Sequence, residues 1–181
     1  MSHLIALTGP RGAGKTTACQ TLIAQARAAN WAVAGLLSPA VVTDGLKTGI
    51  MAEDLQSGET RLLAQSAVNA SESGDDAAYL RFGRWLFDRA VLDWGNAVLA
   101  TAVPCDLLIV DELGPLELLH GSGWVNGLAW LRLGNYRQGV VVIRPELVAA
   151  AQKTLPIAQV IDLAGTMSPI QQAQVLWQGM G

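Results

Sequence analysis

The chain has 181 residues, the length of one ordinary domain, and 51% of them are hydrophobic against 15% charged. Its formal net charge of −3 excludes a general electrostatic attraction to nucleic acid or to anionic membranes. The mean hydropathy of +0.32 favours secondary-structure elements that are covered on both sides. Because the sequence shows neither a signal-peptide pattern nor a long apolar run, we expect a cytoplasmic protein without membrane contact.

The chain opens with a predicted strand, about His3 to Thr8, followed by a glycine-rich turn. A helix is predicted from Lys15, because Cys19, Leu22 and Ile23 recur at helical spacing. The first thirty residues therefore predict strand, loop and helix in succession.

A second strand is predicted near Val33 to Leu37, and residues 38–66 then differ from the rest of the chain. They contain an Asp-Gly step at 44–45 and a Ser-Gly step at 57–58, which suit tight hairpin turns. This pattern predicts an antiparallel β-meander, residues 38–66, inserted into an otherwise alternating chain.

The remaining elements alternate between buried strands and helices. Residues 66–76 are small and polar and are predicted to form the most mobile loop. The further elements predicted are a strand at 84–87, a helix at 89–101 capped by Asp88, a strand at 106–110, a helix at 123–134, a strand at 139–143, a helix after Pro145, a strand at 158–163 and a terminal helix capped by Ser168. The predicted fold class is α/β, a three-layer sandwich around a mainly parallel sheet, in one domain of residues 1–181.

The glycine-rich turn fits the phosphate-loop pattern G-x-x-x-x-G-K-[ST] at every fixed position. Its backbone amides and the start of the following helix would bind phosphate oxygens. Lys15 would reach the β- and γ-phosphates, and the Thr16 hydroxyl would bind Mg²⁺. The residues predicted to bind a nucleotide are Gly9, Pro10, Arg11, Gly12, Ala13, Gly14, Lys15, Thr16 and Thr17.

Two acids, Asp111 and Glu112, follow the predicted buried strand at 106–110. Ligands of open α/β sheets bind beyond the carboxyl ends of the strands, so both acids are expected to face the phosphate loop. We assign Asp111 to Mg²⁺ and Glu112 to the water that attacks the γ-phosphate. A carboxylate bound to Mg²⁺ is a poor base, whereas its neighbour keeps a free oxygen. The alternative is that the two acids only end a strand.

Arg144 directly follows the strand at 139–143, hence at the same sheet edge. It is a candidate to stabilise charge on the γ-phosphate within the same chain, or else to form an ordinary ion pair with Glu146 or Glu117. Trp85 is the candidate for a contact with the nucleotide base. The sequence has no Asn-Lys-x-Asp guanine-binding motif, so no base preference is predicted.

Two cysteines and two histidines are present. Cys19 and Cys105 lack C-x-x-C spacing, and we expect both to be reduced packing residues. His3 and His120 are too few and too far apart in sequence to indicate a metal site.

Four segments carry a resemblance to a known family. They are TGPRGAGKTT at 8–17, GLLSPAV at 35–41, DLQSGETRLLA at 54–64 and VDELGPLEL at 110–118. Together they resemble the small P-loop nucleoside-triphosphatase family of the thermophile and cancer-related type. Many members carry Lys where this chain has Pro115, and charged residues where it has the segment AVV at 40–42.

The resemblance implies a RecA-like core and Mg²⁺-dependent hydrolysis of ATP, GTP, CTP and UTP, with broad base tolerance. It assigns the phosphate loop to Lys15 and Thr16, the metal to Asp111 and the general base to Glu112. Glu117 matches the last acid of the family motif, but no role follows for it. We expect a monomer, and nothing in the sequence favours nucleic acid as a partner.

Two other functions fit the same motifs. In the first, the protein is a nucleotide-dependent binding module in which hydrolysis times the release of a partner. In the second, it transfers the γ-phosphate to a small acceptor. Free phosphate as the product indicates hydrolysis. Turnover that rises when cell extract is added indicates the binding module, and label on an acceptor indicates phosphoryl transfer.

Overall fold

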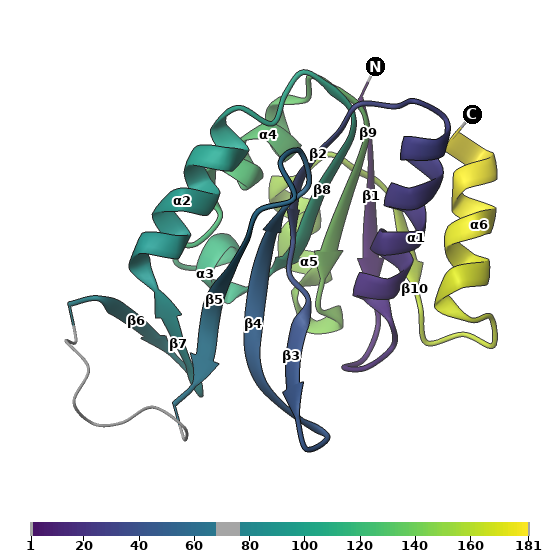
Figure 1. Cartoon of the computed structure of the whole chain (residues 1–181). Coiled ribbons are helices and arrows are strands. Elements are labelled where there is room, and N and C mark those ends of the chain that lie inside the picture. The colour runs from purple at the N-terminus through teal and green to yellow at the C-terminus, as the bar shows by residue number, and fades with distance from the viewer. Residues whose placement is uncertain (1, 68–76, 181) are drawn as a thin grey trace.

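The computed structural model describes residues 2–67 and 77–180, and its centre is one mixed sheet of ten strands. The strands lie in the order β10-β1-β9-β8-β2-β4-β5-β7-β6, and β3 pairs with β4 (Figure 1). In chain order they are β1 (His3–Thr8), β2 (Val33–Leu37), β3 (Ala40–Thr43), β4 (Leu46–Asp54), β5 (Thr60–Ser66), β6 (Tyr79–Phe82), β7 (Trp85–Asp88), β8 (Cys105–Leu113), β9 (Tyr136–Ile143) and β10 (Ile157–Asp162).

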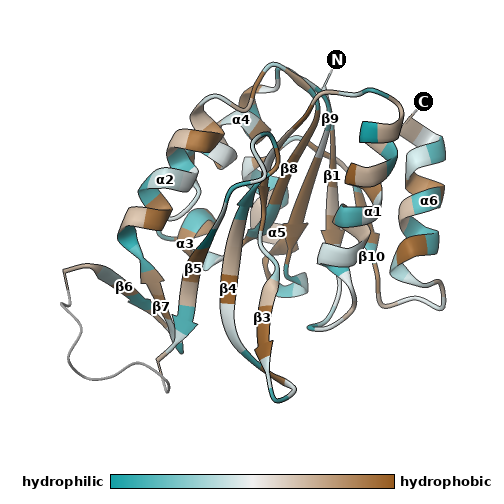
Figure 2. Cartoon of the chain, in the orientation of Figure 1, coloured by the Kyte–Doolittle hydropathy of each residue, from teal (hydrophilic) through white to brown (hydrophobic). Residues whose placement is uncertain are grey.

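One half of the sheet is parallel. β10, β1, β9, β8 and β2 pair with their neighbours in parallel, so their carboxyl ends meet at one edge, the lower edge in Figure 1. The inner strands β1, β2, β8 and β9 contain long apolar runs, drawn mostly brown in Figure 2, because both faces of the sheet are covered there, whereas the edge strand β10 is largely exposed. The predicted strand at 106–110 is longer than expected and continues to Leu113, and that at 139–143 begins already at Tyr136.

The other half of the sheet is antiparallel. β4 pairs antiparallel with β2, β3 and β5, and the sheet continues through β7 to β6. Both predicted turns are present, and Asp44 and Gly45 have the positive φ angles, 51° and 77°, that a tight hairpin requires. The antiparallel part extends beyond residue 66, because β7 adds to β5 and the unpredicted β6 adds to β7.

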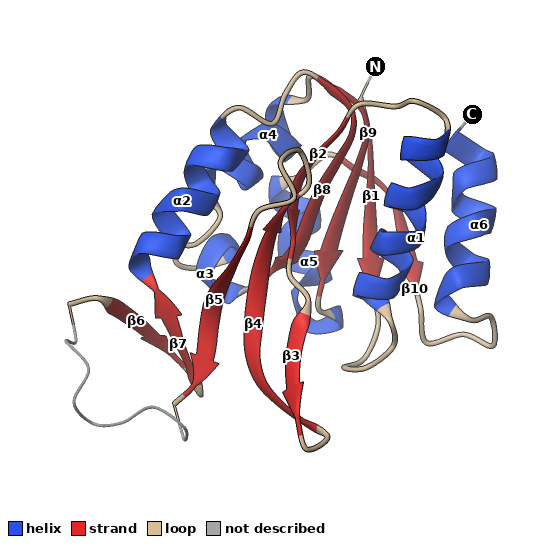
Figure 3. Cartoon of the chain, in the orientation of Figure 1, coloured by secondary structure: helices blue, strands red, loops and turns tan. Residues whose placement is uncertain are grey.

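Helices lie on both sides of the sheet (Figure 3). They are α1 (Lys15–Ala28), α2 (Arg89–Ala100), α3 (Pro115–Leu118), α4 (Val125–Leu133), α5 (Val148–Thr154) and α6 (Pro169–Met180), with a short 3₁₀ helix at Pro145–Leu147. The predicted caps are present: the Asp88 carboxylate accepts from the amides of Ala90 and Val91, and Ser168 and Gln171 form a reciprocal pair of side-chain-to-backbone hydrogen bonds.

The core consists of two apolar clusters, one on each face of the sheet. Along β8, Leu107 and Ile109 belong to the cluster under α1 and α6, whereas Leu108 and Val110 belong to the cluster under α2 and α4. Since alternate residues of a strand point to opposite faces, β8 is buried on both sides. Its last residues are consequently held rigidly at the lower edge of the sheet.

Gly35 allows β2 and β8 to approach each other closely. Its φ of +111° is outside the range of ordinary residues, and a Cβ placed on it would lie 1.9 Å from the backbone oxygen of Ile109. A glycine is therefore required at this pairing of β2 with β8.

The predicted mobile loop at 66–76 is only partly covered by the structure. Ser66 is the last residue of β5, and residues 68–76 lie outside the described part of the chain. Cys19 is buried and Cys105 partly buried, and neither forms a disulfide, as predicted. Within residues 2–67 and 77–180, no helix combines the length and the apolar character needed to cross a membrane.

Candidate functional site

The phosphate loop joins β1 to α1 with three glycines in left-handed conformations, Gly9, Gly12 and Gly14. The Lys15 ammonium donates hydrogen bonds to the backbone oxygens of Gly9, at 2.7 Å, and Pro10, at 2.9 Å. Burial lowers the pKa of Lys15 from its usual value, although nearby acids oppose this effect. The ammonium is thus folded back over the loop, in the space that the sequence predicts for phosphate.

Thr16 and Asp111 lie in direct contact, although 95 positions separate them in the sequence. The Thr16 hydroxyl donates to Asp111 Oδ2 at 3.0 Å, and the Ser38 backbone amide donates to the same oxygen at 3.1 Å. The Ser38 hydroxyl donates to the backbone oxygen of Asp111 at 3.1 Å. One carboxylate therefore joins the start of α1 to the ends of β2 and β8.

Asp111 and Thr16 fit a small hard cation. Asp111 is only 1% exposed, and burial raises the pKa of its carboxyl group to about 6 against the opposing hydrogen bonds. Placing positive charge beside this carboxylate would favour its ionised form. Among the described residues no group of three or more His, Cys, Asp or Glu could hold a metal ion alone. Mg²⁺ needs no such group, because phosphates and waters complete its coordination.

Glu112 lies in a bulge of β8. Its φ is +68°, and the pairing of β8 with β9 changes register between Val110 and Leu113. The Glu112 side chain is partly exposed, and Arg144 Nη2 donates to its Oε1 at 3.1 Å. Arg144 thus forms an ion pair, as one of the two alternatives expected, but its partner is Glu112 and not Glu146 or Glu117, because the bulge turns Glu112 toward the end of β9.

Lys47, on β4, is a site residue that the sequence analysis missed. Its Nζ lies 3.9 Å from Glu112 Oε2 and 5.6 Å from the ring centre of Trp85. Burial lowers the pKa of Lys47, while Glu112 opposes that shift. Glu112 consequently lies between two cations, one on β4 and one directly after β9. No motif marks Lys47, because its position depends on how β4 pairs with β2 near Glu53 and with β3 near Lys47 itself.

A cavity of about 290 Å³ opens next to Glu112. Arg11, Ser38, Glu112 and Arg144 border it at the nucleotide side. The rest of its wall is mainly apolar and includes Ile50, Leu63, Phe82, Trp85, Phe87, Leu92, Leu116 and Trp124. Trp85, the predicted contact of the nucleotide base, therefore lies on the same side of the phosphate loop as Asp111 and Glu112.

Among the described residues, no hydrogen bond or ion pair holds the side chain of Thr17 or of Arg11 at the predicted site. Thr17 is exposed in the first turn of α1, where its backbone oxygen accepts from the Thr21 hydroxyl at 3.0 Å. Arg11 is exposed at the border of the cavity. Arg11 belongs to the phosphate loop and Thr17 follows it directly, whereas Thr16 contacts Asp111, and Arg144 contacts Glu112.

Glu117 has a structural role that the sequence left open. It is 7% exposed, and its two carboxylate oxygens accept from the backbone amides of Gly114, at 2.8 Å, and Trp124, at 2.9 Å. It thereby holds the turn after β8 against the start of α4. Neither oxygen is directed at the proposed nucleotide.

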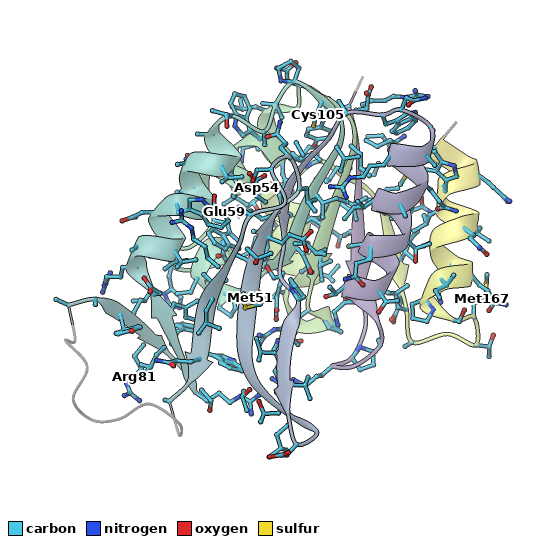
Figure 4. All side chains as sticks on the ribbon, viewed as in Figure 1. Met51, Asp54, Glu59, Arg81, Cys105 and Met167 are labelled. Carbon is cyan, nitrogen blue, oxygen red and sulfur yellow. The ribbon has the colours of Figure 1, made fainter. Side chains whose placement is uncertain are left out.

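Glu117→Gln is expected to lower the free energy of unfolding by about 1–3 kcal/mol, because the amide NH₂ cannot accept from one of the two buried amides. Thermal unfolding measures this loss. Glu59→Gln is the control, since Glu59 pairs only with the exposed Arg61 and lies at the β4–β5 turn (Figure 4). An equal change in both variants would contradict the capping role.

The third family segment, which begins at Asp54, starts with a turn at the opposite edge of the sheet from the phosphate loop (Figure 4). The Asp54 carboxylate accepts from the Gln56 amide at 2.9 Å and from the Ser57 hydroxyl at 2.6 Å. Arg27 donates to the Leu55 backbone oxygen at 2.6 Å and ties the turn to α1. The turn at 54–59 is therefore a structural mark of the fold, whereas Leu63, farther along the same segment, lines the cavity.

The comparisons with known proteins agree with this geometry. Residues 4–122 match the model of a family described as NTPase. The nucleoside-triphosphatase THEP1 of Methanopyrus kandleri is 32% identical over 120 residues, 65% of this chain and 61% of that protein. THEP1 of Ignicoccus hospitalis is 31% identical over 114 residues, 63% of this chain and 60% of that protein. The matched part thus spans about three fifths of the length of these relatives.

Two solved structures share the fold over nearly the whole chain. A human cancer-related nucleoside triphosphatase superposes with a TM-score of 0.70 at 17% identity and covers 98% of this chain and 96% of its own. THEP1 from Aquifex aeolicus superposes with a TM-score of 0.63 at 17% identity, covering 100% of this chain and 97% of its own. At this identity the structures establish the P-loop NTPase fold with its mostly parallel core. The family model covers well over half of the sequence, and the chain therefore belongs to the NTPase family that it describes.

Proposed function

We propose that this protein hydrolyses nucleoside triphosphates, with Mg²⁺, to nucleoside diphosphates and phosphate. The observation that carries the proposal is the contact of Thr16 with Asp111, because it brings the phosphate loop to the acidic end of β8. The names of the relatives, nucleoside-triphosphatase THEP1, point to the same activity. Residues 9–17 bind the phosphates, and Lys15 exchanges its two loop carbonyls for β- and γ-phosphate oxygens.

Mg²⁺, when bound, neutralises charge on the β- and γ-phosphates, and Thr16 and Asp111 are the residues that would hold it. Glu112 takes the proton of the attacking water. In this structure its Oε1 accepts a hydrogen bond from Arg144. The γ-phosphate competes for this guanidinium, which then stabilises the developing charge while the carboxylate becomes free to act as a base.

The proposal includes the finer points of architecture and setting. Residues 1–181 form one domain, a three-layer sandwich of RecA type with residues 38–66 as an inserted meander. Two apolar clusters on opposite faces of one sheet support this arrangement. A monomer suffices, since every proposed site residue comes from one chain. Broad base tolerance is proposed because the family resemblance implies it, and a cytoplasmic location because nucleoside triphosphates are available there.

The deciding experiment measures phosphate release from ATP, GTP, CTP and UTP, each with and without Mg²⁺. We expect release from all four, dependent on Mg²⁺. Lys15→Ala is the negative control, because it removes the cation that contacts the phosphates. Binding of nucleotide without any phosphate release would contradict hydrolysis and favour the binding-module alternative.

Arg144→Ala is expected to lower kcat by roughly 10² or more, the scale of removing one group that stabilises charge in the transition state. Steady-state phosphate release measures the effect. Arg81→Ala is the matched control, because Arg81 is an exposed arginine on β6, outside the cavity wall (Figure 4). Full turnover in a folded Arg144→Ala protein would reduce Arg144 to a surface ion pair.

A further inference from the structure

The cavity beside Glu112 is larger than hydrolysis requires. A single water needs only about 15 Å³ of such space, so a volume near 290 Å³ admits a molecule of many atoms. The size is at the lower end for small-molecule sites, which run from roughly 300 to 1,000 Å³. A hydrolase that activates only water has no use for this volume.

The cavity lies on the γ-phosphate side of the proposed nucleotide. Thr16 and Asp111 mark the metal position, and Glu112 and Arg144, which would face the γ-phosphate, also border the cavity. β1 lies between β10 and β9, so the phosphate loop has the acids on one side and β10 on the other. No cavity-lining residue comes from β10 or α6. The cavity therefore lies away from the β10 side of the phosphate loop, and Trp85, the candidate for a base contact, lines it instead.

The chemistry of the wall defines the class of ligand. Two indoles and two phenyl rings, Trp85, Trp124, Phe82 and Phe87, combine with aliphatic side chains from β4, β5, α2 and α3. Such a wall suits a small, mainly apolar molecule with a ring. Of the two acids at the cavity, Glu117 is fully used by backbone amides, whereas Glu112 contacts only side chains. Glu112 is thus available to accept from a ligand hydroxyl.

We propose that the cavity binds a small, ring-bearing apolar alcohol, which accepts the γ-phosphoryl group in place of water. This inference rests on the proposed nucleotide site. The alcohol oxygen forms a bond to the γ-phosphorus, and the bond from that phosphorus to the β–γ bridging oxygen breaks. The nucleoside diphosphate leaves, and the hydroxyl proton passes to Glu112. Apolar walls exclude water while the alcohol is bound, so transfer competes with hydrolysis.

Three probe alcohols test the site: benzyl alcohol, cyclohexylmethanol and 2-naphthylmethanol. Binding to the wild-type protein is followed without nucleotide by the indole NMR signals of Trp85 and Trp124, both of which line the cavity. Transfer is followed with γ-³²P-labelled ATP and Mg²⁺. We expect saturable shifts for at least one probe, labelled phosphate ester as a product and a matching decrease in free phosphate. 2-Methylnaphthalene lacks the hydroxyl. It should bind in the cavity and inhibit ester formation from the probe alcohols, but it should give no labelled ester itself.

Leu63→Phe places extra atoms in the cavity and should weaken probe binding at least tenfold. Leu62→Phe is the matched control, because Leu62 is the preceding residue of the same strand, is 47% exposed and does not line the cavity. Ile50→Phe fills the cavity from β4 instead and serves if Leu63→Phe does not fold.

Absence of saturable binding by every probe to the wild-type protein would overturn the proposed site. Binding without labelled ester would overturn the acceptor role, and equal binding by the Leu63 and Leu62 variants would place the probe elsewhere. Because binding is measured without nucleotide, these results are separate from a failure of nucleotide hydrolysis, which would appear as absent phosphate release without any probe.

Discussion

Glu112→Gln is expected to bind nucleotide normally and to lose roughly 10² or more in kcat, the usual scale for removing a general base. The amide cannot take a proton from water, yet it keeps the size of the side chain and can still contact Arg144. The loss should appear in kcat and not in nucleotide affinity, because the phosphate loop and Asp111 are untouched. Single-turnover phosphate release together with nucleotide titration separates the two quantities.

The control for that variant is Glu146→Gln, which removes the same charge from an exposed position two residues after Arg144. Glu146→Gln should retain turnover, because the loss expected for Glu112→Gln comes from the missing general base and not from a change of overall charge near the site. Undiminished hydrolysis in Glu112→Gln would remove Glu112 from the mechanism and leave Asp111 as the only acid with a proposed role in turnover.

Gly35→Ala is expected to destabilise the fold by roughly 3 kcal/mol or more, from backbone strain at a positive φ together with overpacking. The added Cβ would lie 1.9 Å from the Ile109 backbone oxygen, and backbone atoms cannot move aside as a flexible side chain can. β2 and β8 would have to separate at the centre of the sheet. The loss would be a large part of a typical stability of about 5–15 kcal/mol.

Gly58→Ala isolates the steric part of this effect. Gly58 also has a positive φ, +77°, but a Cβ there would meet nothing within 4 Å. It should cost only about 1–2 kcal/mol, the penalty of the left-handed conformation. Urea unfolding compares the two variants, and similar losses in both would show that the contact with β8 is unimportant.

The sequence predicted those parts of the molecule that local patterns determine. The phosphate loop, the strand before Asp111 and the caps Asp88 and Ser168 are each specified by neighbouring residues. The pairing of Thr16 with Asp111 was also accessible, because the carboxyl ends of parallel strands share one edge. The prediction matched the structure for these features, which depend only on hydrophobic periodicity, on helix capping or on the direction of the strands.

The features that were missed depend on contacts between distant segments. Lys47 reaches Glu112 through the pairing of β4 with β2 and β3, and nothing near it in the sequence indicates that neighbour. The bulge at Glu112 is a change in register between β8 and β9, which an apolar run cannot reveal. Glu117 looked like a third functional acid, yet two backbone amides account for it. Residue type alone does not separate a capping carboxylate from a catalytic one.

The hydrogen bond from the Ser38 amide to Asp111 has a mechanical consequence. Ser38 is separated from β3 by Pro39 alone, and β3 leads through one tight turn to Lys47 on β4. A cation held by Asp111 would compete with this amide for the carboxylate, so loading of the nucleotide site would change a contact that leads to the hairpin of β3 and β4. Replacement of one bound nucleotide by another should therefore alter the rate at which backbone amides of the β3–β4 hairpin exchange their hydrogens.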